Sequence, residues 1–577
     1  MRSARSAFVF IGLFSFFLNL LMLVSPFYML QIYDRVLSSG SKDTLYVLTM
    51  LAVGLLAVGS MLELVRSRIL VRLGERIDVH LNDAVYDALS QRRLETAKGG
   101  AQPLRDLETV RQFMSSAGLV AFFDAPWTPA FIALIFLFHP WLGMIALFGA
   151  VILFAIALMS EALTRDRLRR SAGNTMAGQA MVEANLRNAE AARAMGMTEA
   201  LRRRWLNRHV EGLTHQSVAN DRSGMLTAIA KLVRPTLQIA MLGVGAFLVI
   251  EQQITAGVMI AGSIIMGRAL APVEASIAHW RSFVAARSAR GRIRELLEAH
   301  PAPDERMSLP EPKGALTVEG VTLLAPGATQ PILMGVSFAV QPGEVVGVTG
   351  PSGAGKSSLA RLLTGVWRPR VGNVRLDGAD LSDWNPEELG QYVGYVPQDV
   401  ELFDGTVAEN IARFQEVQAD KVVEAAQLAG AHEMILRLPL GYDTPIGEAG
   451  ATLSGGQRQR VALARAVYGL PKVIVLDEPN ASLDTDGEKA LSQALKRLRE
   501  LKRTVVMIAH RNNGLGPVDQ ILMVENGRVK SYSNKDQQQA QAAQAAQQGG
   551  GNITSLGSVR APAQQARPQP GEGDDNG

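Results

Sequence analysis

Apolar residues in the first half of the chain gather into six long runs. The first extends from Phe8 to Leu30, and at about 1.5 Å per residue a helix of this length crosses a hydrocarbon layer about 30 Å thick. It is too long for the core of a signal peptide and no small-residue cleavage site follows it, so we interpret it as a retained helix. The other runs cover roughly residues 44 to 64, 118 to 138, 141 to 160, 232 to 250 and 254 to 272. The pattern predicts six membrane spans in a lipid bilayer.

Polar connections between the runs alternate between long and short. The long segments at 66–120 and 161–224 hold most of the arginines of this half, whereas the connections at 31–43, 139–140 and 251–253 carry few basic residues or none. Basic loops stay in the cytoplasm, so the amino terminus and the second half of the chain are predicted to face the cytosol. The long segments keep helical apolar spacing, as in Ile69, Leu73, Ile77 and Leu81, which predicts that the helices continue out of the membrane.

Basic residues in these segments have two interpretations. A single arginine here is expected to be a solvated or snorkelling side chain. Lys231, Arg234 and Arg268 differ because they lie at the ends of the fifth and sixth runs, where a charge has to face water, a partner or a transport pathway. We keep both interpretations open for these three.

The second half of the chain contains a predicted phosphate-binding loop. The segment from Gly350 to Ser357 fits the pattern G-x-x-x-x-G-K-[ST], and it lies between an apolar strand at 344–348 and a helical run at 359–363. Lys356 would hold the β and γ phosphates, and the Ser357 hydroxyl would bind Mg²⁺. The predicted nucleotide-binding residues of this loop are Gly350, Ser352, Gly353, Ala354, Gly355, Lys356, Ser357 and Ser358.

A second apolar strand, residues 473–476, ends in two acidic residues, Asp477 and Glu478. An aspartate at the carboxyl end of a strand can hold the metal and its water shell, and the glutamate after it can polarise the attacking water. The position of this pair, some 120 residues after the phosphate loop, strengthens the prediction, since many parallel strands end in acids.

Between these two motifs lies the string Leu453-Ser454-Gly455-Gly456-Gln457, by which the sequence resembles the ABC superfamily. The remaining elements of that family occur in the expected order, namely a Q-loop glutamine at Gln398, a D-loop at Ser482-Leu483-Asp484 and a switch histidine at His510. The resemblance implies ATP and Mg²⁺ as cofactors, with Gln398 joining Ser357 and Asp477 at the metal. It also implies that Glu478, His510 and Lys356 are catalytic.

The family resemblance further implies an assembly. Ser454, Gly455 and Gly456 would close on the γ-phosphate of ATP held by the opposite subunit, and Gln457 and Asp484 are also implied to bind nucleotide. One chain carries one ATPase half, so a second copy is expected, most simply in a homodimer. One departure concerns adenine, because Ala325 stands where the family usually has a stacking aromatic residue.

Three stretches of the membrane half narrow the class. Residues 26–37, 123–129 and 139–141 look like the type I secretion permease/ATPases of Gram-negative bacteria, and the resemblance covers about residues 6 to 535. It implies an inner-membrane exporter of an unfolded protein with a carboxyl-terminal signal, working with a periplasmic membrane fusion adaptor and an outer-membrane channel protein. No peptidase-like domain precedes the first run, so substrate selection is expected to use the two domains themselves.

Taken together, the fold class is a membrane all-α domain of ABC exporter type fused to an α/β P-loop NTPase domain. The predicted divisions are a membrane domain at 1–300, a linker at 301–313, a nucleotide-binding domain at 314–535 and a disordered Gln/Ala/Gly-rich tail at 536–577. The composition, 47% hydrophobic and 19% charged with a net charge of +4, suits this mixture and gives no argument for nucleic-acid binding. The absence of cysteine excludes disulfides and thiolate metal sites.

Two other functions stay open at this point. A homodimeric lipid or drug exporter would share every ATPase motif. An anchored ATPase that switches partners without transport would share them too, although six spans argue against it.

Overall fold

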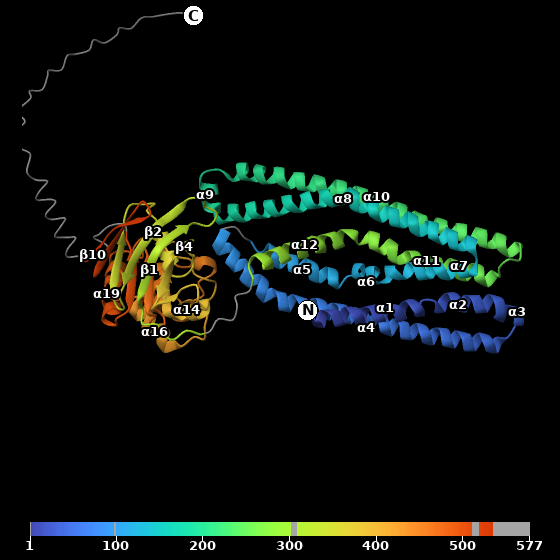
Figure 1. The fold of residues 1–577 in the computed structure, drawn as a ribbon, viewed down its shortest axis with the longest axis horizontal. Helices are drawn as coiled ribbons and strands as arrows, with labels where there is room; N and C mark the ends of the chain where they lie inside the picture. Colours follow the sequence, from blue (N-terminus) through green and yellow to red (C-terminus); the bar gives the residue numbers. More distant parts are fainter. Residues whose placement is uncertain (1, 97–99, 302–307, 510–517, 535–577) are drawn as a thin grey trace, which may run out of the picture. The chain divides into compact units, whose positions relative to one another are not determined.

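The structure, a computed structural model, describes residues 2–96, 100–301, 308–509 and 518–534. The chain divides into two compact units, Met1–Pro303 and Asp304–Gly577. The described part of the first unit is helical, and all the strands lie in the second (Figure 1). The predicted tail at 536–577 and residues 302–307 of the proline-rich linker lie outside the described residues.

The first unit is built from long helices joined by short connections. Its elements are α1 (Arg2–Leu21), α2 (Val24–Gln31), η1 (Ile32–Val36), α3 (Leu37–Ser39), α4 (Lys42–Thr96), α5 (Gln102–Met114), α6 (Ala117–Asp124), η2 (Ala125–Trp127), α7 (Thr128–Phe138), α8 (Pro140–Arg187), α9 (Ala189–Ala194), α10 (Thr198–Ile250), α11 (Ala256–Ala278) and α12 (Trp280–Ala299). In Figure 1, α8 and α10 run side by side and α9 lies at their shared end.

Six helical segments of the described chain are long and apolar enough to cross a membrane, the number that the sequence predicts. Three of them, α4, α8 and α10, have 55, 48 and 53 residues. At a rise of 1.5 Å per residue each is about 70 to 80 Å long. A helix of this length extends far beyond a hydrocarbon layer about 30 Å thick.

Two of the six spans are interrupted, whereas the sequence predicts continuous helices. The first is interrupted at Met22 and Leu23, between α1 and α2, and the third at η2, between α6 and α7. Proline explains both, because it has no N–H to bond the carbonyl four residues earlier. Pro26 leaves the carbonyl of Met22 without its helical partner, and Pro126 does the same for Phe122.

Separate hydrophobic clusters hold the helices of this unit. Buried side chains of α7, α8, α10 and α11 form one cluster, with Phe131, Leu142, Met241 and Ile265 among them. A second, smaller cluster joins α1 to α4 through Ile11, Leu70 and Leu73, and residues of α6 pack against it. The third joins α4, α5 and α12.

The second unit is an α/β fold with two sheets. Its strands are β1 (Leu316–Leu324), β2 (Pro331–Val340), β3 (Val345–Thr349), β4 (Val371–Leu376), β5 (Ala379–Asp380), β6 (Val393–Val396), β7 (Val473–Asp477), β8 (Thr504–Ile508), β9 (Gln520–Glu525) and β10 (Arg528–Asn534). Its helices are α13 (Lys356–Leu363), α14 (Pro386–Tyr392), α15 (Val407–Ile411), α16 (Ala419–Leu428), α17 (His432–Leu436), η3 (Gly441–Asp443), η4 (Glu448–Gly450), α18 (Gly455–Val467) and α19 (Thr485–Glu500).

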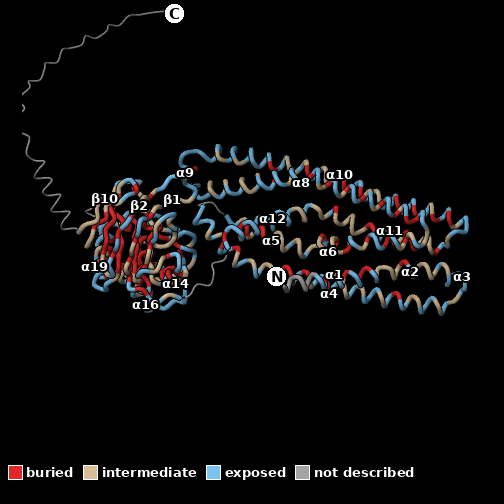
Figure 2. The backbone as a smooth tube through the Cα atoms, viewed as in Figure 1, coloured by how far each residue is buried: buried red, intermediate tan, exposed pale blue. Residues whose placement is uncertain are grey.

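The larger sheet has the order β10-β9-β3-β8-β7-β6, and the smaller, antiparallel sheet has the order β2-β1-β4-β5. In the larger sheet all neighbours are parallel except β9 and β10. Strands β3, β7 and β8 are apolar and buried at nearly every position, as a parallel strand covered on both faces must be (Figure 2). The carboxyl ends of β3 and β7 therefore reach the same edge of the sheet, where the two predicted motifs meet.

Candidate nucleotide site

The phosphate loop connects β3 to α13 and depends on glycine at two positions. Gly350 has φ 152°, and a Cβ placed there would lie 2.0 Å from the backbone oxygen of Val524. Gly355, the N-cap of α13, has φ 98°, and its Cβ would lie 2.7 Å from Leu333 Cδ2. Both combine a left-handed backbone with a close neighbour, so only glycine fits without a shift. The loop thus presents backbone N–H groups at the start of a helix, where anions are stabilised.

Lys356 is the first residue of α13 and is 5% exposed. Its Nζ donates to the carbonyl oxygens of Gly350, at 3.0 Å, and Pro351, at 2.9 Å. The ammonium group therefore lies inside the curve of the loop and is held by the loop's own backbone. A phosphate placed there would meet a positive charge that is already oriented.

Four polar side chains from different elements are joined by hydrogen bonds beside the loop. Ser357 Oγ donates to Asp477 Oδ1 at 3.2 Å and lies 3.5 Å from Gln398 Oε1. Gln398 Nε2 in turn donates to Glu478 Oε2 at 3.3 Å. The structure therefore brings together the predicted residues of the loop, the Q-loop and the end of β7, and Gln398 links the serine to the glutamate.

Asp477 carries the strongest electrostatic signal of this group. Its side chain is fully buried, and this burial raises the pKa of the carboxyl group, with the Ser357 hydrogen bond opposing and the neighbouring Glu478 charge adding to the effect. Its second oxygen, Oδ2, is buried and has no hydrogen-bond partner among the described residues. An unpaired buried carboxylate oxygen beside a serine hydroxyl and an amide oxygen is a donor set that Mg²⁺ prefers. The residues present therefore fit a magnesium ion.

Glu478 follows β7 in a strained conformation. Its φ is 52°, unusual for a residue with a side chain, while its N–H donates to the carbonyl of Ile508 on β8 at 3.2 Å. Such a backbone costs about 1–3 kcal/mol and persists where the surroundings impose it. In this conformation the carboxylate accepts a hydrogen bond from Gln398 and lies next to the residues that fit a magnesium ion.

The signature residues form a second group at the start of α18. Ser454 is the N-cap of this helix, its Oγ accepts from the Gln457 N–H at 3.3 Å, and Gln457 Oε1 accepts from the Ser454 N–H at 2.8 Å. Gly456 is packed so closely that an added Cβ would lie 3.1 Å from the backbone oxygen of Ser482. This reciprocal capping holds the first turn of α18 in a fixed conformation, so the N–H groups at the start of the helix are ordered.

Asp484 belongs to the same group as the signature residues. It caps α19 by accepting from the Gly487 N–H at 2.8 Å, and it pairs with Arg460 of α18 at 3.4 Å. Among the described residues, no hydrogen bond joins Ser454, Gly455 or Gly456 to the phosphate loop. One copy of the chain thus carries two separate halves of the predicted site.

The other predicted positions are placed as follows. In the phosphate loop, Ser352 and Gly353 are exposed, whereas Ala354 and Ser358 are buried. Ala325 follows β1 at a half-buried turn. His510 lies outside the described residues, so its predicted role stays a prediction.

The sequence analysis missed Arg413. This largely buried side chain donates to four backbone carbonyls, those of Gly390 and Val393 near the start of β6 and of Arg465 and Ala466 at the end of α18. Burial lowers its pKa to about 10, with the nearby Arg465 charge acting in the same direction. Arg413 therefore ties the signature helix to the sheet. Its only sequence signal was an arginine directly after the apolar Ile411-Ala412 pair.

Of the three basic residues at the span ends, only Arg234 has a defined partner. It forms an ion pair with Glu274 of α11 at 3.2 Å, while both side chains keep some solvent exposure. Lys231 and Arg268 are exposed. The partner interpretation therefore applies to Arg234.

A helical unit with six apolar spans, joined to an α/β unit with a phosphate loop and a signature helix, defines an ATP-driven transporter. A family model described as ABC transporter transmembrane region matches residues 8–271, and one described as ABC transporter matches residues 333–481. The chain is 44% identical over 540 residues to the type I secretion system ATP-binding protein PrsD of Rhizobium meliloti, with 93% of each chain covered.

More distant relatives agree with this likeness. The exotoxin translocation ATP-binding protein PaxB of Pasteurella aerogenes is 30% identical over 539 residues, which cover 91% of this chain and 75% of PaxB. A solved structure of a bacterial Atm1-family ABC exporter with ATP bound has the same fold, with a TM-score of 0.80 at 23% identity over 96% of this chain and 99% of the other. The chain belongs to the ABC transporter family and, within it, to the type I secretion system ATP-binding proteins. It is thus an ATP-hydrolysing, multi-pass membrane protein.

Proposed function

We propose that the chain is an inner-membrane exporter of type I secretion, which works as a homodimer and uses ATP to move an unfolded protein with a carboxyl-terminal signal outward. The observation that carries the proposal is the likeness to a type I secretion ATP-binding protein across both units. The arginine-rich connections support an orientation with the ATPase unit in the cytoplasm. A periplasmic adaptor and an outer-membrane channel protein would be the partners.

The two half-sites of one chain support the proposed homodimer. Lys356 and the loop amides of one copy would bind the β and γ phosphates, which would replace the loop carbonyls now paired with the ammonium group. Ser454 and the N–H groups of Gly455 and Gly456 from the second copy would cover the γ-phosphate. Binding of ATP would then draw the two ATPase units together.

Within this composite site each residue of the sheet edge has a separate task. Ser357, Asp477 and Gln398 would hold the magnesium ion, which neutralises phosphate charge when bound. Glu478 would orient and polarise the attacking water, and its carboxylate is held in place by Gln398 Nε2 at 3.3 Å. The amide of Gln398 would therefore contact both the magnesium ligands, through its oxygen, and Glu478, through its nitrogen. His510 would contact the γ-phosphate.

The experiment uses the purified chain in lipid nanodiscs and measures ATP hydrolysis with the carboxyl-terminal segment of a protein secreted by the host. The amino-terminal segment of the same protein is the matched control. We expect the carboxyl-terminal segment alone to change the rate, and only in the chain with Glu478 intact. A rate that responds to lipids or drugs and ignores both segments would support the rival lipid or drug exporter. Export by vesicles that contain the chain and its partners would exclude an ATPase without transport.

A further inference from the structure

The break in the third span coincides with the stretch from Phe123 to Pro129, which the sequence analysis singled out and the ATPase chemistry does not use. Helix α6 ends at Asp124, η2 follows, and α7 begins at Thr128. Pro126 disfavours a regular α-helix here, because the ring removes a helical N–H and clashes with the preceding turn. The span changes to a single 3-10 turn at this position, and this turn is the break.

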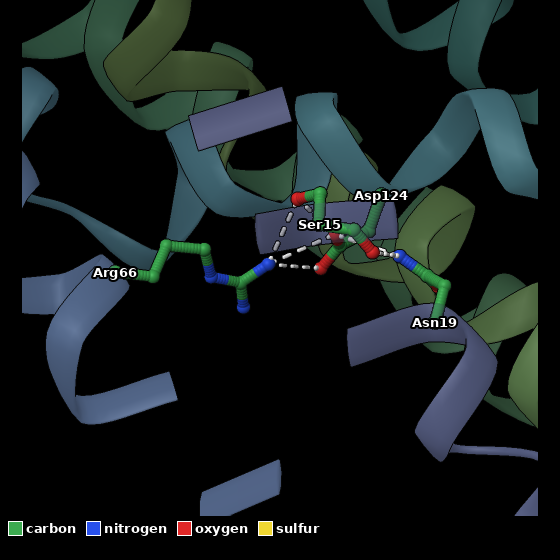
Figure 3. Close-up of polar contacts among 4 residues, drawn as sticks. All are labelled: Ser15, Asn19, Arg66 and Asp124. Carbon is green, nitrogen blue, oxygen red and sulfur yellow. Dashed lines mark hydrogen bonds and ion pairs between the residues drawn. The ribbon is translucent and has the colours of Figure 1, made fainter. Parts of the chain in front are cut away.

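On one side of the break, Asp124 is held by α1 and α4 (Figure 3). Its Oδ1 accepts from Ser15 Oγ at 2.9 Å, from Asn19 Nδ2 at 3.1 Å and from Arg66 Nη1 at 3.0 Å. Arg66 Nη1 also donates to Ser15 Oγ at 3.0 Å. The four residues are 1% to 7% exposed. We call Ser15, Asn19, Arg66 and Asp124 the buried polar cluster.

On the other side of the break, the chain is held by a different helix. The hydroxyl of Thr128, the first residue of α7, donates to the carbonyl of Ala269 on α11 at 2.8 Å. Ala269 lies one turn before Pro272, which is inside α11. Four residues along the chain thus separate an attachment to α1 and α4 from an attachment to α11.

The two attachments belong to two different hydrophobic clusters among the three described for the membrane unit. Residues of α6 pack on the cluster of Ile11, Leu70 and Leu73, whereas α7 contributes Phe131 to the cluster that it shares with α8, α10 and α11. The rings of Phe16 and Trp127, 5.2 Å apart, meet across the junction. Closely packed clusters move as bodies and deform little inside, so a break between them is where relative movement is easiest.

The charges of the buried polar cluster are not equivalent. Without Arg66, Asp124 would keep two neutral donors, Ser15 and Asn19. Without Asp124, Arg66 would keep only the Ser15 hydroxyl, and a guanidinium group stays charged at any physiological pH. Removing the aspartate alone should therefore lower the free energy of unfolding more than removing the arginine alone. Replacing both residues by apolar ones should restore most of this stability.

We propose that Asp124 is a positioning residue for transport, which anchors the end of α6 to α1 and α4 so that the α6–α7 break acts as the pivot between the two hydrophobic clusters. When ATP binds, the part with α1, α4 and α6 would turn relative to the part with α7, α8, α10 and α11. The proposal rests on the proposed export activity only for its transport readout. The pivot itself is measured without any exported protein.

The first test measures distances across the break and within one part. The chain has no cysteine, so spin labels can be placed by single substitutions, with labelled copies diluted in unlabelled chain. Met61 on α4 and Ile239 on α10 are 70% and 72% exposed and report across the break, and Val9 with Met61 reports within one part. We expect trapping with ATP and vanadate to shift the Met61–Ile239 distance and to leave the Val9–Met61 distance unchanged. Equal behaviour of both pairs would overturn the pivot.

The second test asks whether the cluster serves movement or only stability. In the double variant Arg66→Met with Asp124→Leu, we expect normal folding and basal ATP hydrolysis, but transport per ATP reduced about tenfold or more and a Met61–Ile239 distance that no longer responds to nucleotide. The control, Arg292→Met with Asp106→Leu, removes an aspartate that is also buried, together with its arginine partner, which is more exposed than Arg66; this pair joins α5 to α12 away from the break. The control should keep transport per ATP.

The outcomes of the second test are decisive in both directions. Full transport by the Arg66/Asp124 double variant, or an equal loss in the control, would overturn the proposal. Should the double variant fail to fold, Thr128→Val decides instead, because it releases the other side of the break without touching a charge. It should lower transport per ATP in the same way, and unchanged transport would again contradict the pivot.

Discussion

Replacement of Asp477 by asparagine should change stability in opposite directions with and without nucleotide. The aspartate is fully buried, its Oδ1 accepts from Ser357 at 3.2 Å, and its Oδ2 has no hydrogen-bond partner in the part of the chain that the structure describes. Asparagine has the same size, so no cavity forms, and its oxygen can still accept from the serine. The substitution therefore removes a buried negative charge and leaves the packing intact.

The direction of the stability change without nucleotide follows from the pKa of Asp477, which burial raises above its usual value. An acid with a raised pKa in the folded state destabilises the fold as pH rises from its unfolded pKa, about 3.9, through its folded pKa, by about 1.4 kcal/mol for each unit of difference. The asparagine variant lacks this penalty at neutral pH. The amide nitrogen that replaces Oδ2 stays buried, so only the charge penalty is lost, and the variant should melt roughly 3 to 6 °C higher without nucleotide for each unit of this pKa shift.

With nucleotide the order should reverse. Wild-type chain saturated with magnesium and ATP at about 100 times Kd gains about 2.7 kcal/mol from binding, and the variant should lose most of that gain with the carboxylate. Thermal melting of the full-length chain in detergent, with and without magnesium and ATP, measures both effects. Asp486→Asn is the matched control, because that side chain is 84% exposed. A variant that melts lower without nucleotide, or is stabilised by magnesium and ATP as strongly as wild type, would refute the role of Asp477.

Substitutions at three further positions test other parts of the site. Glu478→Gln should lower ATP hydrolysis by about 10²–10⁴-fold while nucleotide still binds, and a variant that keeps a tenth of the wild-type rate would contradict its role. Gly350→Ala should lower the melting temperature and weaken nucleotide binding, because its Cβ would meet the Val524 oxygen at 2.0 Å; wild-type binding would mean that the loop adapts. Arg413→Met should cost about 1–3 kcal/mol, seen as a lower melting temperature, by leaving carbonyl groups without donors, and Arg413→Lys should recover only part of this loss if the planar guanidinium is what matters.

Local sequence signals were enough to predict the six spans and to predict that the phosphate loop lies beside the Asp477-Glu478 pair. Six apolar runs predict six spans because length and hydropathy alone decide whether a helix can cross a bilayer. The phosphate loop and the Asp477-Glu478 pair were predictable because parallel strands bring their carboxyl ends to one edge of a sheet. The breaks at Met22 and at η2 could have been predicted from Pro26 and Pro126.

Contacts between distant segments were beyond the sequence. Arg66 and Asp124 are 58 residues apart, and their pairing depends on how far α4 and α6 are rotated about their axes, which apolar periodicity fixes only coarsely. The role of Arg413 was not predicted, because its four acceptors are backbone carbonyls, which carry no sequence signature. The strained φ of Glu478 likewise follows from its bond to β8.

The composite site is tested most directly by mixed dimers of two differently tagged chains. One mixture pairs a Lys356→Ala chain with a Ser454→Arg chain, and the other pairs a chain carrying both substitutions with an unaltered chain. If each nucleotide lies between Lys356 of one copy and Ser454 of its partner, the first mixture retains one intact site and hydrolyses ATP, whereas the second retains none and is inactive. Activity in the second mixture together with inactivity in the first would contradict the account.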